Sequence, residues 1–155
     1  MKRSTDRILT THVGSLARPV ELLDTMKEKE NDRAYDAKLF DRQVREAVAD
    51  RVQHQVDAGI DIVTDGEQSK SSFLGYVKDR LGGFELADGP SGLAPSWQKE
   101  VDDFPEYYEE YFKKYSSAVT PLRRIICTGP ITYVGQELLQ KDIDNLKAAV
   151  EGKDV

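Results

Sequence analysis

Hydrophobic positions along this chain alternate between short β-branched runs and longer stretches with helical spacing. The clearest stretch spans residues 36–58, where one phenylalanine and four valines recur at every fourth position: Phe40, Val44, Val48, Val52 and Val56. This spacing puts one apolar stripe on a long amphipathic helix. Gly59 follows at the position where a helix commonly ends, so the pattern predicts a helix over residues 36–58.

Three short apolar runs predict β-strands, over residues 8–13, 60–64 and 124–127. Each run is followed by a polar turn that contains glycine, which is typical of a strand that ends at a turn. The three turns are Val13-Gly14-Ser15, Asp65-Gly66-Glu67 and Thr128-Gly129-Pro130.

Shorter stretches with helical spacing lie between and after these runs. One begins at Pro19, which suits the first turn of a helix, and ends before a charged loop or frayed end at residues 27–33. The others span residues 72–81, ended by Gly82 and Gly83, residues 104–115 and residues 138–150.

Strands that alternate with helices predict an α/β fold with parallel strands and crossover connections. Three strands do not close a barrel, because an eight-stranded (β/α)8 barrel needs about 250 residues. The chain is therefore either a small layered α/β domain or about the first three β/α units of a TIM barrel. We expect the second, because the composition does not change before the chain stops after a helix.

Composition and charge narrow the possible functions. The net charge of −6 disfavours a nucleic-acid partner, since phosphate binding needs clustered Lys and Arg. No apolar run is long enough for a membrane span or a secretory signal, so we expect a cytoplasmic protein.

The few cysteines and histidines predict no metal site of the chain's own. A disulfide is impossible with one cysteine, Cys127, which we expect to be a small hydrophobic residue of the core. Of the two histidines, we expect His12 to be a hydrogen-bonded neighbour of the site and His54 to lie at the surface. Two His and one Cys are too few of the usual zinc ligands to predict a zinc site formed by this chain alone.

Parallel α/β proteins bind ligands beyond the carboxyl ends of their strands, where the three turns are expected to lie. Gly14 and Ser15 offer backbone N–H groups and a hydroxyl to a carboxylate. Asp65 and Glu67 can accept hydrogen bonds from an ammonium group. Together they suit an amino acid, although glycine turns and acidic helix caps also serve purely structural roles.

Three ordered segments resemble the C-terminal, catalytic domain of cobalamin-independent methionine synthase and its short stand-alone relatives. Residues 10–19 (TTHVGSLARP) are similar to the family's first-strand signature. Residues 59–67 (GIDIVTDGE), with Phe73, Tyr76 and residues 81–84, are similar to its second-strand segment, and residues 128–132 (TGPIT) to a later strand end. The resemblance implies that residues 1–155 are the N-terminal portion of a (β/α)8 barrel domain.

The resemblance also implies a reaction. Family members transfer a methyl group from 5-methyltetrahydrofolate, in its polyglutamate form, to the zinc-bound thiolate of homocysteine, which gives methionine. The resemblance further implies that Val13, Gly14 and Ser15 bind the homocysteine carboxylate and that Glu67 binds its amino group. The family's zinc ligands and catalytic histidine lie further along its chain, so no metal ligand and no catalytic residue is expected here, and the isolated chain should be inactive.

Two alternatives remain at this stage. A related zinc-dependent transferase could act on another thiol, such as coenzyme M, which lacks the amino group. Alternatively, the chain is a catalytically inactive half-barrel that self-associates or joins a complementing C-terminal half.

Overall fold

The structure, a computed structural model, describes residues 3–31, 33–86, 95–115 and 125–155. The chain divides into two compact units, unit 1 (Met1–Ser71 with Gly135–Val155) and unit 2 (Ser72–Val134). Helices and strands are both present, which confirms the mixed α/β class. No helix among the described residues is long and apolar enough to cross a membrane.

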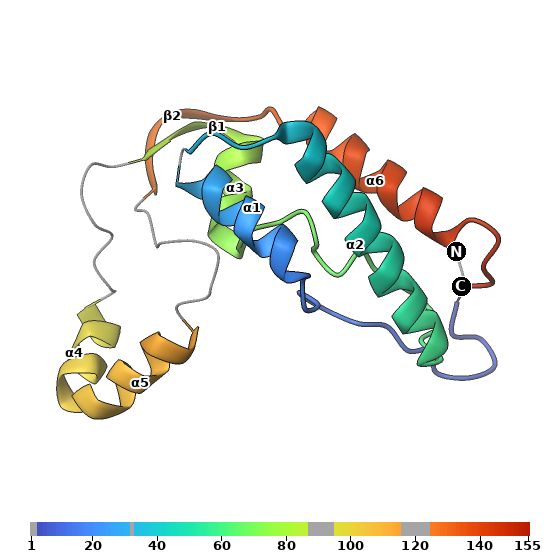
Figure 1. Ribbon diagram of the computed structural model, residues 1–155, viewed down its shortest axis with the longest axis horizontal. Coiled ribbons are helices and arrows are strands. Elements are labelled where there is room, and N and C mark those ends of the chain that lie inside the picture. The colour runs from blue at the N-terminus through green and yellow to red at the C-terminus, as the bar shows by residue number, and fades with distance from the viewer. Residues whose placement is uncertain (1–2, 32, 87–94, 116–124) are drawn as a thin grey trace. The chain divides into compact units, whose positions relative to one another are not determined.

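Unit 1 is built on three helices, α1 (Val20–Glu30), α2 (Ala37–Asp57) and α6 (Gln136–Val150). Both α1 and α6 pack against α2, and Figure 1 shows α6 running beside it. An ion pair of 2.9 Å between Lys141 Nζ and Asp41 Oδ2 joins α6 to α2. The buried apolar side chains of this unit are Leu22, Met26, Val44, Ala47, Val48, Val52 and Ala149.

Helix α2 confirms the strongest prediction from the sequence to within one residue at each end. The Asp36 side chain accepts hydrogen bonds from the backbone N–H groups of Lys38 (2.9 Å) and Leu39 (3.1 Å), which satisfies two donors at the helix start. Gly59, with φ of +75°, ends the helix in the left-handed conformation that glycine adopts most readily. Three of the four valines of the stripe, Val44, Val48 and Val52, are buried, so packing of that face holds the helix.

Helix α1 is longer than the sequence indicated. It continues through the charged residues to Glu30, where a loop or frayed end was expected from Lys27 onward. Its last turn is closed by Asn31, whose side-chain amide donates to the Lys27 carbonyl at 2.7 Å. The charged residues are compatible with helix because Lys27 and Lys29 stand near its carboxyl end, where cations are favourable.

Unit 2 contains α3 (Phe73–Arg80), β1 (Leu81–Leu86), α4 (Pro95–Asp103), α5 (Pro105–Tyr115) and β2 (Ile125–Tyr133). Strands β1 and β2 pair antiparallel, with Leu81 opposite Tyr133 and Leu86 opposite Ile125. The expected parallel pairing of the third strand is therefore wrong. That strand also continues through Thr128-Gly129-Pro130, where a turn was expected.

Gly82 and Gly83 were predicted to follow the end of a helix over residues 72–81. Helix α3 ends at Arg80, one residue before the predicted end, and both glycines lie within β1. Gly83 has φ of +86° and lies so close to the Pro130 and Gly129 carbonyls of β2 that no Cβ fits there. Glycine is thus required here by strand contact.

Cys127 also departs from its prediction. It is exposed on β2, where a buried core position was expected, and its thiol lies 3.4 Å from the Gly129 carbonyl oxygen. A run of apolar residues indicates a strand, but a two-stranded sheet need not be covered on both faces. His54, by contrast, is exposed on α2 as expected.

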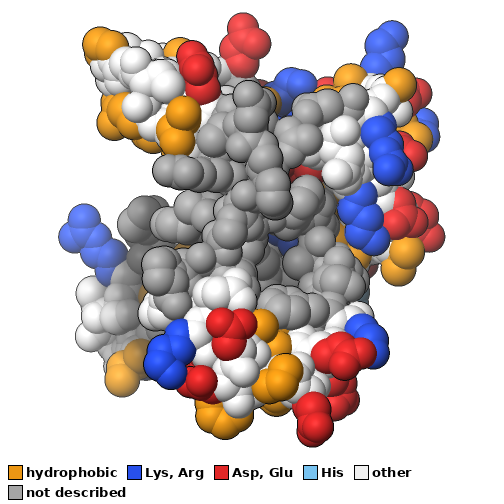
Figure 2. All heavy atoms as spheres, turned by 90° about the vertical axis from the view of Figure 1, so that its left-hand side faces the viewer, with side chains coloured by type: hydrophobic (Ala, Val, Ile, Leu, Met, Phe, Trp, Pro, Cys, Tyr) orange, Lys and Arg blue, Asp and Glu red, His pale blue; other side chains and the backbone are white. Residues whose placement is uncertain are grey.

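Helix α5 presents an aromatic cluster. Tyr108 is buried and its ring meets those of Tyr107 and Tyr111, at centroid distances of 5.1 and 5.8 Å. Tyr107 and Phe104 remain exposed. The lower part of Figure 2, at the height of α4 and α5 in Figure 1, shows acidic side chains next to hydrophobic ones.

Candidate functional site: the turns after two parallel segments

The first two predicted strands are present as extended segments that lie side by side in unit 1. A parallel bridge joins Thr11 to Ile62, and the Ile62 N–H donates to the Thr10 carbonyl at 3.1 Å. The Thr11 hydroxyl adds a hydrogen bond of 2.7 Å to the Ile62 carbonyl. Because the segments run parallel, the turns that follow them come to the same end, as the sequence predicted.

Asp61 clamps the start of this segment pair. Its carboxylate accepts from the Arg7 guanidinium, and from the Thr10 backbone N–H (2.8 Å) and hydroxyl (3.0 Å). The Arg7 guanidinium and the Thr10 N–H hold the pKa of the Asp61 carboxyl well below its usual range. The clamp therefore depends on an ionised Asp61.

A buried side chain from α2, Gln55, makes the backbone hydrogen bonds on the second segment (residues 60–64) that a neighbouring strand would otherwise make. The Gln55 amide donates to the Thr64 carbonyl at 2.9 Å, and its oxygen accepts from the Thr64 N–H at 3.0 Å. Gln55 is only 5% exposed, and these two hydrogen bonds give partners to its buried amide. This amide fixes the residue that leads into the acidic turn.

The acidic turn has an unusual backbone. Gly66 and Glu67 both have positive φ, +60° and +56°, and Glu67 is the only non-glycine residue with positive φ among the described residues. The Gln68 N–H donates to the Asp65 carbonyl at 3.4 Å, and the Asp65 side chain accepts from the Glu67 N–H at 3.0 Å. A left-handed glutamate costs of order 1–3 kcal/mol and persists only where its surroundings enforce it.

Contacts with the loop that contains Ser15 enforce this conformation. The Leu16 N–H donates to the Gly66 carbonyl at 2.9 Å, and the fully buried Gln68 amide donates to the Leu16 carbonyl at 3.1 Å. The half-buried Arg18 guanidinium donates to the carbonyls of Glu67 (2.8 Å) and Lys70 (2.6 Å). We call residues 13–18 and 65–70 the loop pair.

The loop pair brings the predicted site residues together. The Ser15 hydroxyl donates to Glu67 Oε2 at 2.5 Å, and Glu67 is half-buried while Ser15 is exposed. Val13 is 87% exposed, and a Cβ added to Gly14 would meet no atom within 4 Å. Within the described part of the chain, the backbone N–H groups of residues 13–15 donate no hydrogen bond. A hydroxyl, open N–H groups and a carboxylate thus border one exposed surface.

Three residues of this region were not predicted from the sequence as contributors. Arg18 lies inside the motif at residues 10–19, and its place in that motif could have marked it as a site residue. Its two carbonyl partners, on Glu67 and Lys70, lie 49 and 52 residues further along the chain, so the sequence alone does not show the contacts. Gln55 and Gln68 carried no signal, because an isolated glutamine gives no sign of burial.

His12 differs from its prediction as a hydrogen-bonded neighbour of the site. Its Nε2 atom is buried and has no hydrogen-bond partner among the described residues. The described residues also contain no group of three or more His, Cys, Asp or Glu side chains placed to hold a metal ion. They do not fit a zinc ion, and we assign them no step that passes through one.

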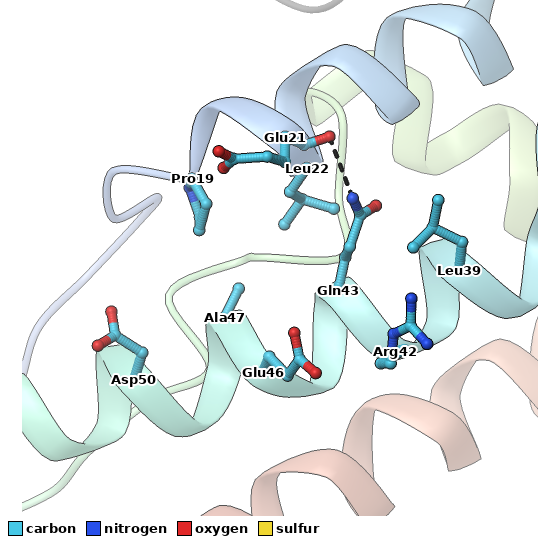
Figure 3. Close-up of a pocket in the computed structure, with 9 residues that line it drawn as sticks. All are labelled: Pro19, Glu21, Leu22, Leu39, Arg42, Gln43, Glu46, Ala47 and Asp50. Atoms are coloured by element: carbon cyan, nitrogen blue, oxygen red, sulfur yellow. Dashed lines mark hydrogen bonds between the residues drawn. The ribbon is translucent and has the colours of Figure 1, made fainter.

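A separate groove of about 440 Å³ lies between α1 and α2. Figure 3 shows Gln43 of α2 donating across it to the Glu21 carbonyl, at 3.4 Å. None of the loop-pair residues lines this groove. Its acidic side chains, Glu21, Glu46 and Asp50, belong to a different surface.

Two parallel extended segments that are connected through helices and end in polar turns define a β–α–β class of protein with its ligand edge at those turns. The comparison with known proteins specifies this further. Residues 8–154 match the family described as the cobalamin-independent synthase catalytic domain, and the chain belongs to this family. This confirms the resemblance found in the sequence.

A curated relative is methionine synthase from Sulfurisphaera tokodaii. It is 31% identical to this chain over 136 residues, which is 79% of the chain and 38% of the relative. The chain therefore spans well under half the length of that relative.

Proposed function

We propose that the loop pair binds the charged groups of an amino-acid thiol, homocysteine, within a methionine-synthase-type (β/α)8 barrel. The substrate carboxylate accepts from the Ser15 hydroxyl and the N–H groups of residues 13–15, and its ammonium group donates to Glu67. The observation that carries the proposal is the 2.5 Å hydrogen bond between Ser15 and Glu67, which puts a donor for a carboxylate beside an acceptor for an ammonium.

Binding would exchange one hydrogen bond for two. Ser15 now donates to Glu67, so an arriving amino acid gives the hydroxyl a new acceptor and gives the Glu67 oxygen a charged donor. A hydrogen bond to a charged group contributes about 1.5–3 kcal/mol, which favours this exchange for a zwitterion. A thiol without the amino group satisfies Ser15 but leaves Glu67 without its donor.

In the proposed reaction a methyl group passes from methyltetrahydrofolate to the homocysteine thiol, giving methionine. In this family a zinc ion binds the substrate thiol. In our proposal the ligands of that zinc ion lie outside these residues, in a complementing part of the barrel. Ser15 and Glu67 orient the substrate and take no part in the transfer itself. The exposed apolar side chains Ile8 (87%) and Ile62 (38%), near the parallel bridge, suit a position beside further strands of such a barrel.

The choice between an amino-acid thiol and a thiol such as coenzyme M depends on Glu67. The test is an NMR titration of the 155-residue chain with L-homocysteine and with 4-mercaptobutanoate, which lacks the amino group. Replacement of Glu67 by Gln should weaken homocysteine binding roughly ten- to hundredfold, from the value of a charge-assisted hydrogen bond. Binding of 4-mercaptobutanoate should hardly change.

The matched control is Glu46→Gln, which removes an exposed carboxylate from α2 outside the loop pair. It should change neither titration. If Glu67→Gln weakens both thiols equally, or neither, Glu67 does not bind the ammonium group and the amino-acid assignment is wrong.

A further inference from the structure

Arg18 occupies a position that the proposed binding mode does not explain. Its side chain crosses from the Ser15 loop to the acidic turn, where a single nitrogen, Nη2, donates to the Glu67 and Lys70 carbonyls. No carboxylate oxygen lies within hydrogen-bond or ion-pair distance of this guanidinium among the described residues. Arg18 is a half-buried cation whose hydrogen bonds go to two backbone carbonyls, which indicates that it controls the backbone conformation.

The carbonyl that Arg18 holds belongs to the left-handed residue itself. The Glu67 carbonyl accepts from both Arg18 and the Lys70 N–H (3.0 Å), which fixes the peptide plane that follows Glu67. The peptide plane that precedes Glu67 is held by the Leu16 N–H, which donates to the Gly66 carbonyl at 2.9 Å. Together the two planes set the direction in which the Glu67 side chain leaves the backbone. That direction brings its carboxylate to the Ser15 hydroxyl.

From this geometry we infer that Arg18 is a positioning residue, which holds Glu67 in its left-handed conformation and so aims its carboxylate at the substrate ammonium. The inference rests on the proposed function, since it assigns Arg18 a task within the same site. Burial lowers the pKa of the Arg18 guanidinium, and the Glu67 and Asp65 carboxylates oppose that shift. An arginine keeps its charge in such a place, and the rigid guanidinium fixes the directions of the two N–H bonds of Nη2, which the freely rotating ammonium of a lysine does not.

An electrostatic role and a positioning role for Arg18 predict opposite results. A positive charge near Glu67 repels the ammonium group of homocysteine, whereas it attracts the carboxylate that homocysteine and 4-mercaptobutanoate share. On electrostatic grounds alone, removal of Arg18 should therefore raise the preference for homocysteine over 4-mercaptobutanoate. If Arg18 positions Glu67, its removal should lower that preference although a repulsive charge has gone. The sign of the change in preference therefore separates the two roles.

The experiment titrates the 155-residue chain with L-homocysteine and 4-mercaptobutanoate in the wild type and in Arg18→Met, Arg18→Lys, Glu67→Gln and the Arg18→Met/Glu67→Gln double variant. We expect Arg18→Met to lower homocysteine affinity at least tenfold and to leave 4-mercaptobutanoate affinity within twofold. The double variant should lose no more than Glu67→Gln alone, because Arg18 acts through Glu67. Arg18→Lys should lie between the wild type and Arg18→Met.

A backbone measurement accompanies the titration. A left-handed residue has a short distance between its amide and α protons, so wild-type Glu67 should show a strong intraresidue NOE that weakens in Arg18→Met. Arg7→Met is the matched control, because it removes another guanidinium that ties the N-terminal segment to residues 60–70. It should leave the NOE and the preference for homocysteine unchanged.

The outcomes separate this inference from the proposed function. A wild-type chain that binds both thiols equally contradicts the proposed function. If Glu67→Gln abolishes the preference for homocysteine while Arg18→Met and Arg18→Lys leave both it and the Glu67 NOE intact, only the inference about Arg18 is wrong. A higher preference for homocysteine in Arg18→Met also overturns it, as does a further loss in the double variant.

Discussion

Two pairs of extended segments in this chain are held together by different kinds of hydrogen bond. Strands β1 and β2 of unit 2 share an antiparallel backbone ladder with one irregularity, between Gly82 and Phe84. The parallel segments of unit 1 share one bridge, and the side chains of Asp61, Thr11 and Gln55 supply further bonds to their backbone. A ladder uses groups that every residue other than proline has, whereas the second arrangement depends on particular side chains.

This difference bears on where a ligand can bind. A completed ladder uses up the N–H groups that face the neighbouring strand. In unit 1 the ladder is replaced by side-chain contacts, and the N–H groups of residues 13–15, which donate to no group in the described part of the chain, lie at an exposed surface. The region with fewer backbone pairs is therefore the one that can recognise a charged group, and it is held in shape by contacts that single substitutions can remove.

The largest effect is expected in the backbone ladder, at the closest approach of its strands. Gly83→Ala would place a Cβ against the Pro130 and Gly129 carbonyls and would also force alanine to adopt φ of +86°. Strain and overpacking together should cost about 3 kcal/mol or more, because backbone atoms cannot move aside separately. Chemical denaturation and hydrogen exchange of the β1 and β2 amides measure it.

Gly129→Ala is the control for this substitution. Gly129 lies in the same part of β2, but a Cβ there meets no atom within 4 Å. The change should therefore stay below about 0.5 kcal/mol. Equal losses from both substitutions would show that close approach at Gly83 is not what constrains the ladder.

A smaller loss is expected from Gly66→Ala in the loop pair. The added Cβ would lie 2.9 Å from Leu16 Cβ at a residue with φ of +60°. We expect a loss of about 2 kcal/mol, because the closest approach of 2.9 Å is less severe than the 2.4 Å approach at Gly83 and forces a smaller shift. Gly59→Ala, with φ of +75° and no atom within 4 Å, isolates the conformational cost and should lose only about 1 kcal/mol.

The difference between Gly66→Ala and Gly59→Ala measures how much the contact between Leu16 and Gly66 contributes to stability. Urea denaturation of both variants gives the two free energies of unfolding. If Gly59→Ala loses as much as Gly66→Ala, the contact between Leu16 and Gly66 does not hold the loops together.

The smallest effect is a change with pH at the Asp61 clamp. The pKa of Asp61 is lowered in the folded chain, so its contribution to stability is fully present above its unfolded pKa of about 3.9 and is lost as the pH falls toward the folded value. Asp61→Asn should therefore melt at a lower temperature than the wild type at pH 7, and this difference should shrink below about pH 4. Thermal melts at several pH values measure it.

An exposed ion pair provides the comparison for this clamp. Asp24 pairs with Lys27 on α1 at 3.4 Å, and Asp24→Asn should change the melting temperature little at pH 7. If the difference between Asp61→Asn and the wild type persists unchanged at the lowest pH, the contribution of Asp61 is not that of its ionised carboxylate.

The sequence by itself determined what depends on near neighbours. The spacing of Val44, Val48 and Val52 predicted α2, and Gly59 predicted its carboxyl end, because a helix is closed by contacts three and four residues apart. The motif at residues 10–19 and the acidic turn at Glu67 indicated the family, which the comparison confirmed. The parallel order of the first two segments also followed from local elements.

Only the tertiary structure decided which distant groups meet. The pairing of β2 with β1, the exposure of Cys127 and the contact of Arg18 with the Glu67 turn each depend on residues far apart in the chain. From the sequence alone, a glycine at position 83 looks the same whether it ends a helix or allows the backbone of a neighbouring strand to come close. The left-handed backbone of Glu67 has no local cause either, since glutamate avoids it in isolation, and contacts with Leu16, Arg18 and Gln68 supply the free energy that holds it.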